Sequence, residues 1–285
     1  MASRDSRYPV NRVATDAGRT SAPTVGAGVS DAQVEAIPGW FLPDDRTVFR
    51  FFLGEQARNG QRGDLAELGV YLGSSAVLIG SYQQPGEVFT VVDLFGRTGD
   101  DPVTDAETRR YYRGLTQVAF EANYRAVHGD LPVVIRGPST DIRGRAASGR
   151  HRFVHVDASH EYANVIADIE TAKDLLTGDG IVVFDDVQSA RFPGVAAAVW
   201  PELHDGLVPL VLSSEKLYAT WGIPDEWQRA VRRWIDGSDL QSHVHQIGGH
   251  DVVRVWRNDR YAGLGAFVPP VLVPLAVRTR RLLGF

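Results

Sequence analysis

The sequence predicts a doubly wound α/β fold, in which a mostly parallel sheet of seven strands carries helices on both faces. Three observations lead to this prediction. From Asp64 onward, short apolar segments alternate with amphipathic ones, as strands and helices do in this class. The apolar segments are β-branched and lack a polar face, which is typical of buried parallel strands. A glycine-containing turn follows the first of them, where sheets of this class bind ligands.

The individual elements follow from the same patterns. Helical spacing of apolar residues predicts the helices, and short apolar runs bounded by turn residues predict the strands. We expect strands at 65–71, 88–95, 131–137, 152–158, 180–186 and 207–214, the last ones near 216–222 and 251–258, and helices at 47–58, 74–83, 104–124, 160–176 and 224–237.

The two ends of the chain differ from its centre. Residues 1–30 are rich in Ser, Thr, Ala, Gly and Arg without periodicity, which predicts a disordered arm. One folded domain is expected over 31–260. Residues 261–285 form an apolar tail with three prolines and a basic end. Packing onto the body, contact with a second copy in a homo-oligomer, and peripheral membrane contact all remain open for this tail.

Composition excludes several classes of function. The chain of 285 residues has no cysteine, so disulfides, thiolate metal sites and thiol catalysis are excluded. With 30 Lys and Arg against 35 Asp and Glu, no basic excess indicates a nucleic-acid partner. No apolar run is long enough to predict a membrane span, and the N-terminus lacks the apolar core of a secretory signal. A cytoplasmic protein is expected.

The turn after the first strand has the pattern E-x-G-x-x-x-G, formed by Glu67, Gly69 and Gly73. Glycine lets the backbone approach a ligand closely, although tight helix–strand packing would also explain it. The pattern is neither the dinucleotide fingerprint nor the phosphate loop, so NAD and ATP are disfavoured. Asp93 ends the second strand, where an acid can accept hydrogen bonds from the ribose hydroxyls of an adenosine ligand. A helix cap or a surface acid is the alternative for Asp93.

Acidic residues also follow two later strands. Asp157 ends one predicted strand, and Asp185 and Asp186 end the next. If these strands are neighbours, the three carboxylates share one crevice and need protons or a cation to offset their repulsion. An oxygen-only donor set suits Mg²⁺, although some of these acids could simply cap helices. His160 lies beside the cluster and could take a proton from a hydroxyl, or could face solvent.

Three segments together resemble a known family. AELGVYLGSSAVLIG, VVDLFG and FVHVDASHEYANVIADIETAKDLLTGDGIVVFDDV resemble class I S-adenosylmethionine-dependent methyltransferases, which have a Rossmann-like fold. The nearest branch contains the macrocin-type sugar O-methyltransferases and the cephalosporin-hydroxylase-like proteins. The resemblance covers residues 37–200 and implies that 31–260 is a methyltransferase domain.

The resemblance implies a role for each matching residue. Asp157, Asp185 and Asp186 match metal-binding acids, and His160 matches the general base of the sugar O-methyltransferases. Asp93 matches the ribose acid, and Ser139 falls near the adenine end. The residues implied to bind the cofactor are Glu67, Gly69, Tyr71, Gly73, Ser75, Asp93 and Ser139.

The predicted activity is transfer of the methyl group of S-adenosyl-L-methionine to a hydroxyl of a small molecule. A sugar of a glycosylated metabolite, a glycolipid sugar or a polyphenol would each fit as acceptor. Mg²⁺ assistance and a histidine base are expected. A metal-independent N- or O-methyltransferase and a non-catalytic cofactor-binding module are the alternatives, and fold alone does not decide between them.

Overall fold

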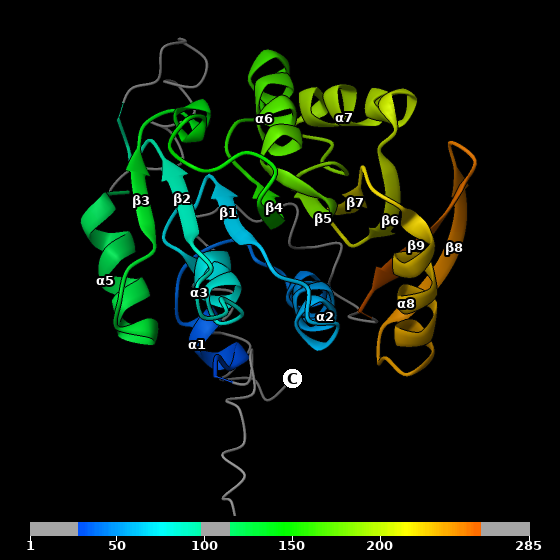
Figure 1. The fold of residues 1–285 in the computed structure, drawn as a ribbon, viewed down its shortest axis with the longest axis horizontal. Helices are drawn as coiled ribbons and strands as arrows, with labels where there is room; N and C mark the ends of the chain where they lie inside the picture. The colour runs from blue at the N-terminus through cyan, green and yellow to red at the C-terminus, as the bar shows by residue number, and fades with distance from the viewer. Residues whose placement is uncertain (1–27, 98–114, 258–285) are drawn as a thin grey trace, which may run out of the picture.

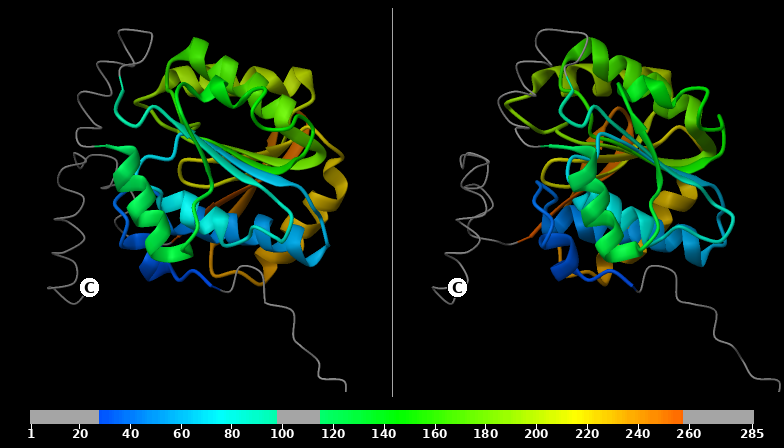
Figure 2. Two further views of the ribbon diagram at one scale, coloured as in Figure 1. Left: turned by 60° about the vertical axis from the view of Figure 1, so that its left-hand side comes forward. Right: turned by 90° about the vertical axis from the view of Figure 1, so that its left-hand side faces the viewer.

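A nine-stranded sheet lies between two layers of helices in the computed structural model, which describes residues 28–97 and 115–257 (Figures 1 and 2). The predicted tail at 261–285 and residues 1–27 of the predicted arm lie outside the described residues. The strands are β1 Asp64–Leu68, β2 Phe89–Asp93, β3 Val133–Arg136, β4 His151–Val156, β5 Leu176–Phe184, β6 Val208–Leu212, β7 Leu217–Thr220, β8 Gln241–Ile247 and β9 His250–Trp256.

The helices cover both faces of the sheet, as predicted. Helices α6 and α7 lie on one face, and α1, α2, α3, α5 and α8 lie on the other (Figure 2). Their bounds are α1 Asp31–Glu35, α2 Pro43–Arg58, α3 Ser74–Gly80, α5 Gln117–His128, α6 Tyr162–Leu175, α7 Pro193–Val199 and α8 Pro224–Asp236, with short 3₁₀ helices η1 Ser139–Ile142 and η2 Trp200–Asp205.

The strand order is β3-β2-β1-β4-β5-β7-β6-β9-β8. The first five strands are parallel, β7 is antiparallel to β5 and β6, and β8 is antiparallel to β9. The prediction of a mostly parallel doubly wound sheet is confirmed, but the predicted count of seven strands was wrong: each of the eight ranges expected to be strands overlaps a strand of the sheet, and β8 is the ninth. Strand β8 escaped prediction because it is an edge strand exposed along nearly its whole length, so its sequence lacks the apolar alternation that marks a strand.

Several element ends also differ from the prediction. Strand β1 stops at Leu68 because Gly69 has φ +81°, which breaks the extended chain. Helix α2 begins four residues early, with Pro43 in its first turn. Thr116 caps α5 by accepting a hydrogen bond from the N–H of Ala119, so the helix begins at Gln117. The helix predicted at 104–124 is therefore wrong at 115–116. Its residues 104–114 lie outside the described part.

Side chains alternate between two apolar clusters, one under each helical layer. On β4, Phe153 packs toward α2, and Val154 and Val156 pack toward α6. By the same alternation, the α2 face receives Glu67 of β1 and His155 of β4, which are paired across the two strands. Polar groups therefore enter the α2 face at the carboxyl ends of the central strands.

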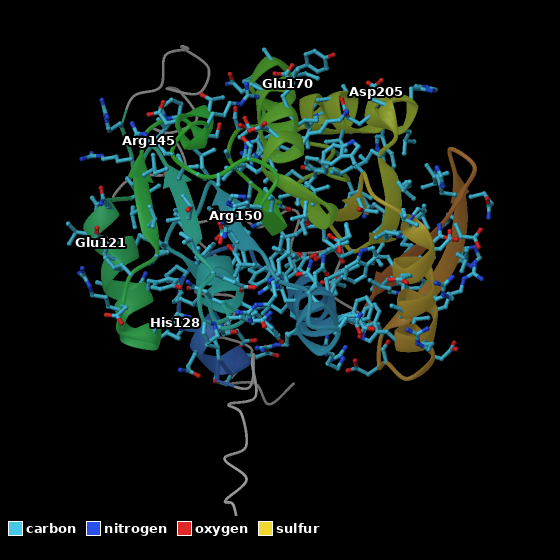
Figure 3. All side chains as sticks on the ribbon, viewed as in Figure 1. Glu121, His128, Arg145, Arg150, Glu170 and Asp205 are labelled. Carbon is cyan, nitrogen blue, oxygen red and sulfur yellow. The ribbon has the colours of Figure 1, made fainter. Side chains whose placement is uncertain are left out.

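Figure 3 shows charged side chains such as Glu170 of α6 and Asp205 of η2 on the outer side of the helical layer. Among residues 28–97 and 115–257, none of the helices combines the length and apolar character that crossing a bilayer requires.

Candidate active site

The glycine turn brings the ends of β1, β2 and β4 into direct contact. The N–H of Gly69 donates to the carbonyl of Val92 at 2.8 Å. A Cβ at Gly69 would lie 2.0 Å from the carbonyl oxygen of Asp157. Only glycine fits here, because the backbone after β4 occupies the space of a side chain and φ is +81°. The predicted cofactor turn and the predicted metal residue Asp157 are therefore neighbours.

Asp93 holds the shape of this turn. Its Oδ2 accepts the N–H groups of Val70 at 2.8 Å and Tyr71 at 3.0 Å, and its Oδ1 accepts that of Phe95 at 2.6 Å. Burial raises the pKa of Asp93, and these three hydrogen bonds oppose the rise. A carboxylate has about four lone-pair positions, so one remains on Oδ1 for a ligand hydroxyl.

The side chain of Glu67 points into the protein interior, where it contacts Ser75 and His155. The side chain is fully buried, and its Oε1 accepts hydrogen bonds from the hydroxyl of Ser75 and from Nδ1 of His155, the latter at 2.7 Å. Its Oε2 has no hydrogen-bond partner among the described residues. Glu67 and Ser75 thus form one buried unit that ties β1 to α3 and β4.

Of three further predicted cofactor residues, two belong to the turn and one follows β3. Gly73 adopts φ +95° before α3, and a Cβ there would press on the ring of Phe120 at 3.0 Å. Tyr71 also has positive φ, +48°, and its ring lies 5.2 Å from that of Trp40. Ser139 begins η1 after β3, and its hydroxyl donates to the buried carboxylate of Asp168. Its remaining capacity toward a ligand is therefore that of an acceptor.

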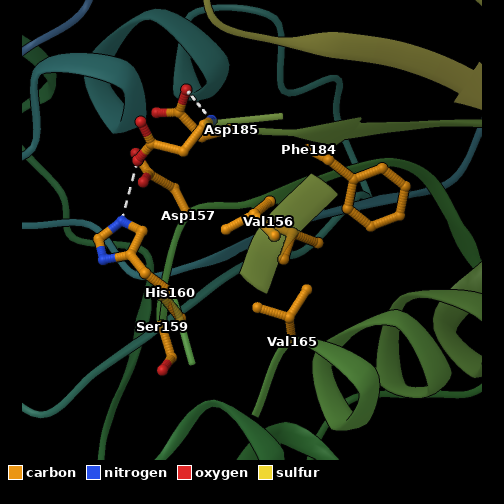
Figure 4. A pocket seen from close by; sticks show the side chains of 10 residues that line it. Val156, Asp157, Ser159, His160, Val165, Phe184 and Asp185 are labelled. Atoms are coloured by element: carbon orange, nitrogen blue, oxygen red, sulfur yellow. Dashed lines mark hydrogen bonds and ion pairs between the residues drawn. The ribbon is translucent and has the colours of Figure 1, made fainter. Parts of the chain in front are cut away.

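The acidic residues converge at the ends of β4 and β5, which are parallel neighbours (Figure 4). The N–H of Asp157 donates to the carbonyl of Leu68 at 2.7 Å, and that of Asp185 donates to Val156 at 3.0 Å. Asp157 and Asp185 carry carboxylate oxygens within 4.8 Å of one another. Together with His160 and Asp186 they line a hollow between the two strand ends.

A buried lysine compensates part of this charge. The ammonium of Lys216, at the turn between β6 and β7, forms an ion pair with Oδ2 of Asp185. Burial alone would raise the pKa of Asp185, but Lys216 lowers it to about 2. Burial and the neighbouring charge of Asp185 raise the pKa of Asp157 well above its usual range. Asp157 consequently holds a proton more readily than its neighbour does.

The contacts of His160 include an acidic group and an aromatic ring. Its Nε2 lies 2.9 Å from Oδ2 of Asp186, and its ring stacks on that of Phe192 with centroids 3.8 Å apart. Asp186 itself has φ +56°, and its N–H donates to Oδ1 of Asp185 at 2.8 Å. The strained backbone at Asp186 turns its carboxylate toward His160, an arrangement that is common at functional sites.

Sequence reasoning missed four polar residues at this site. Lys216 and Glu215 lie in a turn with no recognisable motif, and burial raises the pKa of Glu215 to about 7. Asp45, in the first turn of α2, is fully buried and accepts the hydroxyl of Ser213. His155 could have been found, because it lies two residues before Asp157 in a buried strand and so points to the same face.

Replacing Lys216 with methionine is expected to lower the melting temperature by roughly 10 °C, because Asp185 would remain buried without its counter-charge. Lys173→Met is the matched control, since that ammonium is half exposed and lies 3.8 Å from Glu202. Thermal unfolding of both variants measures the effect. A Lys216→Met protein as stable as the wild type would contradict the assigned ion pair.

The comparisons with known proteins agree with this geometry. Residues 66–187 match the sequence model of a methyltransferase domain family. The O-methyltransferase NovP is similar in structure, with a TM-score of 0.50, 14% identity, and coverage of 62% of this chain and 79% of NovP. A protein from Corynebacterium glutamicum gives a TM-score of 0.49, 14% identity, and coverage of 68% of this chain and 91% of that protein. No curated protein sequence matches the chain significantly.

At such identities a structural likeness shows the fold alone, and the family match covers the glycine turn, Asp93 and the strand ends with their acids. The family match confirms the resemblance to methyltransferases that the sequence motifs indicated. The protein is a methyltransferase, and its residues 66–187 match the methyltransferase domain of that family.

Proposed function

We propose that this protein transfers the methyl group of S-adenosylmethionine to a hydroxyl of a small molecule, assisted by a divalent cation at the acidic cluster. The observation that carries the proposal is the contact between Gly69 and the backbone of Asp157. It places the turn expected to hold the methyl donor directly beside the groups expected to hold the acceptor. Methyl transfer requires such proximity, since the donor and the acceptor oxygen must meet in line.

The residues around the glycine turn fit the cofactor. Gly69 offers backbone without a side chain, and Asp93 keeps a lone pair for a ribose hydroxyl next to the turn that it shapes. Tyr71, Gly73 and Ser75 follow β1, and Ser139 follows β3, which is parallel to β2 and so ends at the same edge of the sheet. Glu67 accepts a hydrogen bond from the hydroxyl of Ser75 and so holds Ser75 from the interior side.

The acidic cluster fits a cation. Two sets of three donor groups are each close enough to share one ion, namely His155 with Asp157 and Asp185, and Asp157 with His160 and Asp186. Crowded carboxylates raise the pKa of Asp157, and a dication would relieve that repulsion. When bound, S-adenosylmethionine supplies an activated methyl group and the cation supplies a Lewis acid that lowers the pKa of a coordinated hydroxyl.

His160 is the proposed general base. If Nε2–H donates to Asp186, the neutral ring carries its lone pair on Nδ1, which becomes the proton acceptor. Asp186 then stabilises the imidazolium that forms, and stacking on Phe192 keeps the ring from turning. A hydroxyl acceptor needs this base, because the neutral alcohol must lose its proton as the new bond forms.

Calorimetric titration with S-adenosylmethionine, in EDTA and again with Mg²⁺, tests the proposal. Asp93→Asn is expected to weaken cofactor binding by at least about tenfold, since it removes a charged acceptor for ribose. Asp130→Asn, at an exposed position, serves as the control. Absence of cofactor binding by the wild type would overturn the proposal. Methyl transfer to a sugar or phenol acceptor that persists fully in EDTA would instead favour the metal-independent alternative.

A further inference from the structure

His155 is a buried histidine in which one ring nitrogen lacks a hydrogen-bond partner among the described residues. It lies within β4, its side chain is fully buried, and Phe49 packs edge-to-face against its ring at 5.1 Å. Its Nδ1 is 2.7 Å from Oε1 of Glu67. Its Nε2 has no hydrogen-bond partner among the described residues. A buried polar atom without a partner costs roughly 1–3 kcal/mol, so this one calls for an explanation.

The unpartnered nitrogen belongs to a ring that lies at the acidic cluster. Donor atoms of His155, Asp157 and Asp185 all lie within 4.8 Å of one another. Because Nδ1 is hydrogen-bonded to Glu67, Nε2 is the nitrogen available to a ligand. The ring of Phe49 packs against the imidazole and holds it in this orientation. A neutral imidazole that donates Nδ1–H to Glu67 has its lone pair on Nε2.

The carboxylates of the cluster retain coordination capacity. Oδ2 of Asp185 pairs with Lys216, and Oδ1 accepts one N–H from Asp186. Each carboxylate oxygen has two lone pairs, so a position remains on either one. A cation at Asp157 and Asp185 can therefore also reach the imidazole.

Glu67 completes a recognisable arrangement. Histidine ligands of metals usually donate their second N–H to a carboxylate, which fixes the tautomer and makes the ligating nitrogen more basic. Glu67 occupies that position relative to His155, and the hydroxyl of Ser75 holds the same oxygen of Glu67. One imidazole with two carboxylates suits Mn²⁺, Fe²⁺, Co²⁺ or Zn²⁺ better than Mg²⁺, which favours oxygen ligands.

We propose that His155, oriented by Glu67, is a nitrogen ligand of the cation held by Asp157 and Asp185, and that the site therefore selects a first-row transition-metal dication over Mg²⁺. This inference rests on the cation site of the proposed function and changes the identity of its metal. It also gives Glu67, predicted as a cofactor residue, a role in orienting a metal ligand.

Pulsed electron paramagnetic resonance of the Mn²⁺-loaded full-length protein, without S-adenosylmethionine, tests the assignment. The echo modulation of the wild type is expected to show coupling to an imidazole ¹⁴N. His155→Asn should lose this coupling, because the Asn amide can replace Nδ1–H toward Glu67 but has no Nε2. His160→Asn, the same substitution at the other histidine of the cluster, should retain it. Calorimetry should show Mn²⁺ binding at least tenfold tighter than Mg²⁺ in the wild type, and this preference should fall in His155→Asn.

Wild-type protein that binds Mn²⁺ without ¹⁴N coupling, or that binds Mg²⁺ as tightly, would overturn the assignment and leave the proposed function intact. Loss of the coupling in His160→Asn would also overturn the assignment, because it would show that His160 is the nitrogen ligand. If His155→Asn does not fold, the wild type and His160→Asn still decide. A protein that binds no dication would overturn both cation proposals, and titration with S-adenosylmethionine then tests cofactor binding on its own.

Discussion

Gly69→Ala is expected to abolish S-adenosylmethionine binding and to lower the melting temperature by more than about 10 °C. The added Cβ would lie 2.0 Å from the carbonyl oxygen and 2.5 Å from the carbonyl carbon of Asp157, which is backbone and cannot rotate away. Either β1 separates from the end of β4 or the glycine turn changes conformation. Each change would displace the residues that are expected to contact the cofactor. Calorimetric titration and thermal unfolding measure the two effects.

Gly206→Ala separates the clash from the backbone strain. Gly206 follows η2 in the left-handed region with φ +88°, but no atom lies within 4 Å of its ideal Cβ. Its substitution should cost only about 1 kcal/mol, the strain of a left-handed alanine, and should leave cofactor binding unchanged. Equal losses of stability in the two variants, with cofactor binding retained in Gly69→Ala, would show that the contact with Asp157 does not shape the site.

Asp157→Asn is expected to reduce methyl transfer by more than about 100-fold while raising the melting temperature at pH 8 by at least about 3 °C. Asparagine has nearly the same shape and can donate to Asp185 where protonated Asp157 would. It removes a charge that burial and Asp185 disfavour. The pKa of Asp157 is raised in the folded state, so its stability contribution is lost as the pH rises. The advantage of asparagine should therefore grow as the pH rises above about 4, the ordinary pKa of an unfolded aspartate.

Asp205→Asn is the control, since Asp205 is exposed on η2 and should affect neither activity nor stability. Cofactor titration of Asp157→Asn should match the wild type, because the role of Asp157 concerns the cation and the acceptor. Retained activity would remove Asp157 from the catalytic machinery. A lower melting temperature at every pH would contradict the inferred carboxylate repulsion.

The central part of the fold could be predicted from the sequence because its signals are local. The apolar runs of β1, β2, β4 and β5 are short and end at or just before glycine or aspartate, so both their existence and the convergence of their ends were predictable. The adjacency of Asp157 and Asp185 follows from this topology alone. Strand β8 carries no such signal, because a solvent-exposed edge strand needs no apolar face.

The parts of the site that could not be predicted depend on contacts between residues far apart in the chain. Lys216 reaches Asp185 only because β7 inserts between β5 and β6, an order that no spacing reveals. The bond between Glu67 and His155 likewise depends on the parallel register of β1 with β4. The motif predicted that Glu67 binds the cofactor. The register between β1 and β4 instead places the Glu67 side chain against His155, with which it forms a hydrogen bond.

A crystal structure of the protein with S-adenosylhomocysteine and Mn²⁺ tests the central claim most directly. The account predicts a ribose hydroxyl hydrogen-bonded to Asp93, backbone of Gly69 against the ligand, and the ion on Asp157 and Asp185. A ligand bound elsewhere, or an adenosine whose ribose does not contact Asp93, would contradict it.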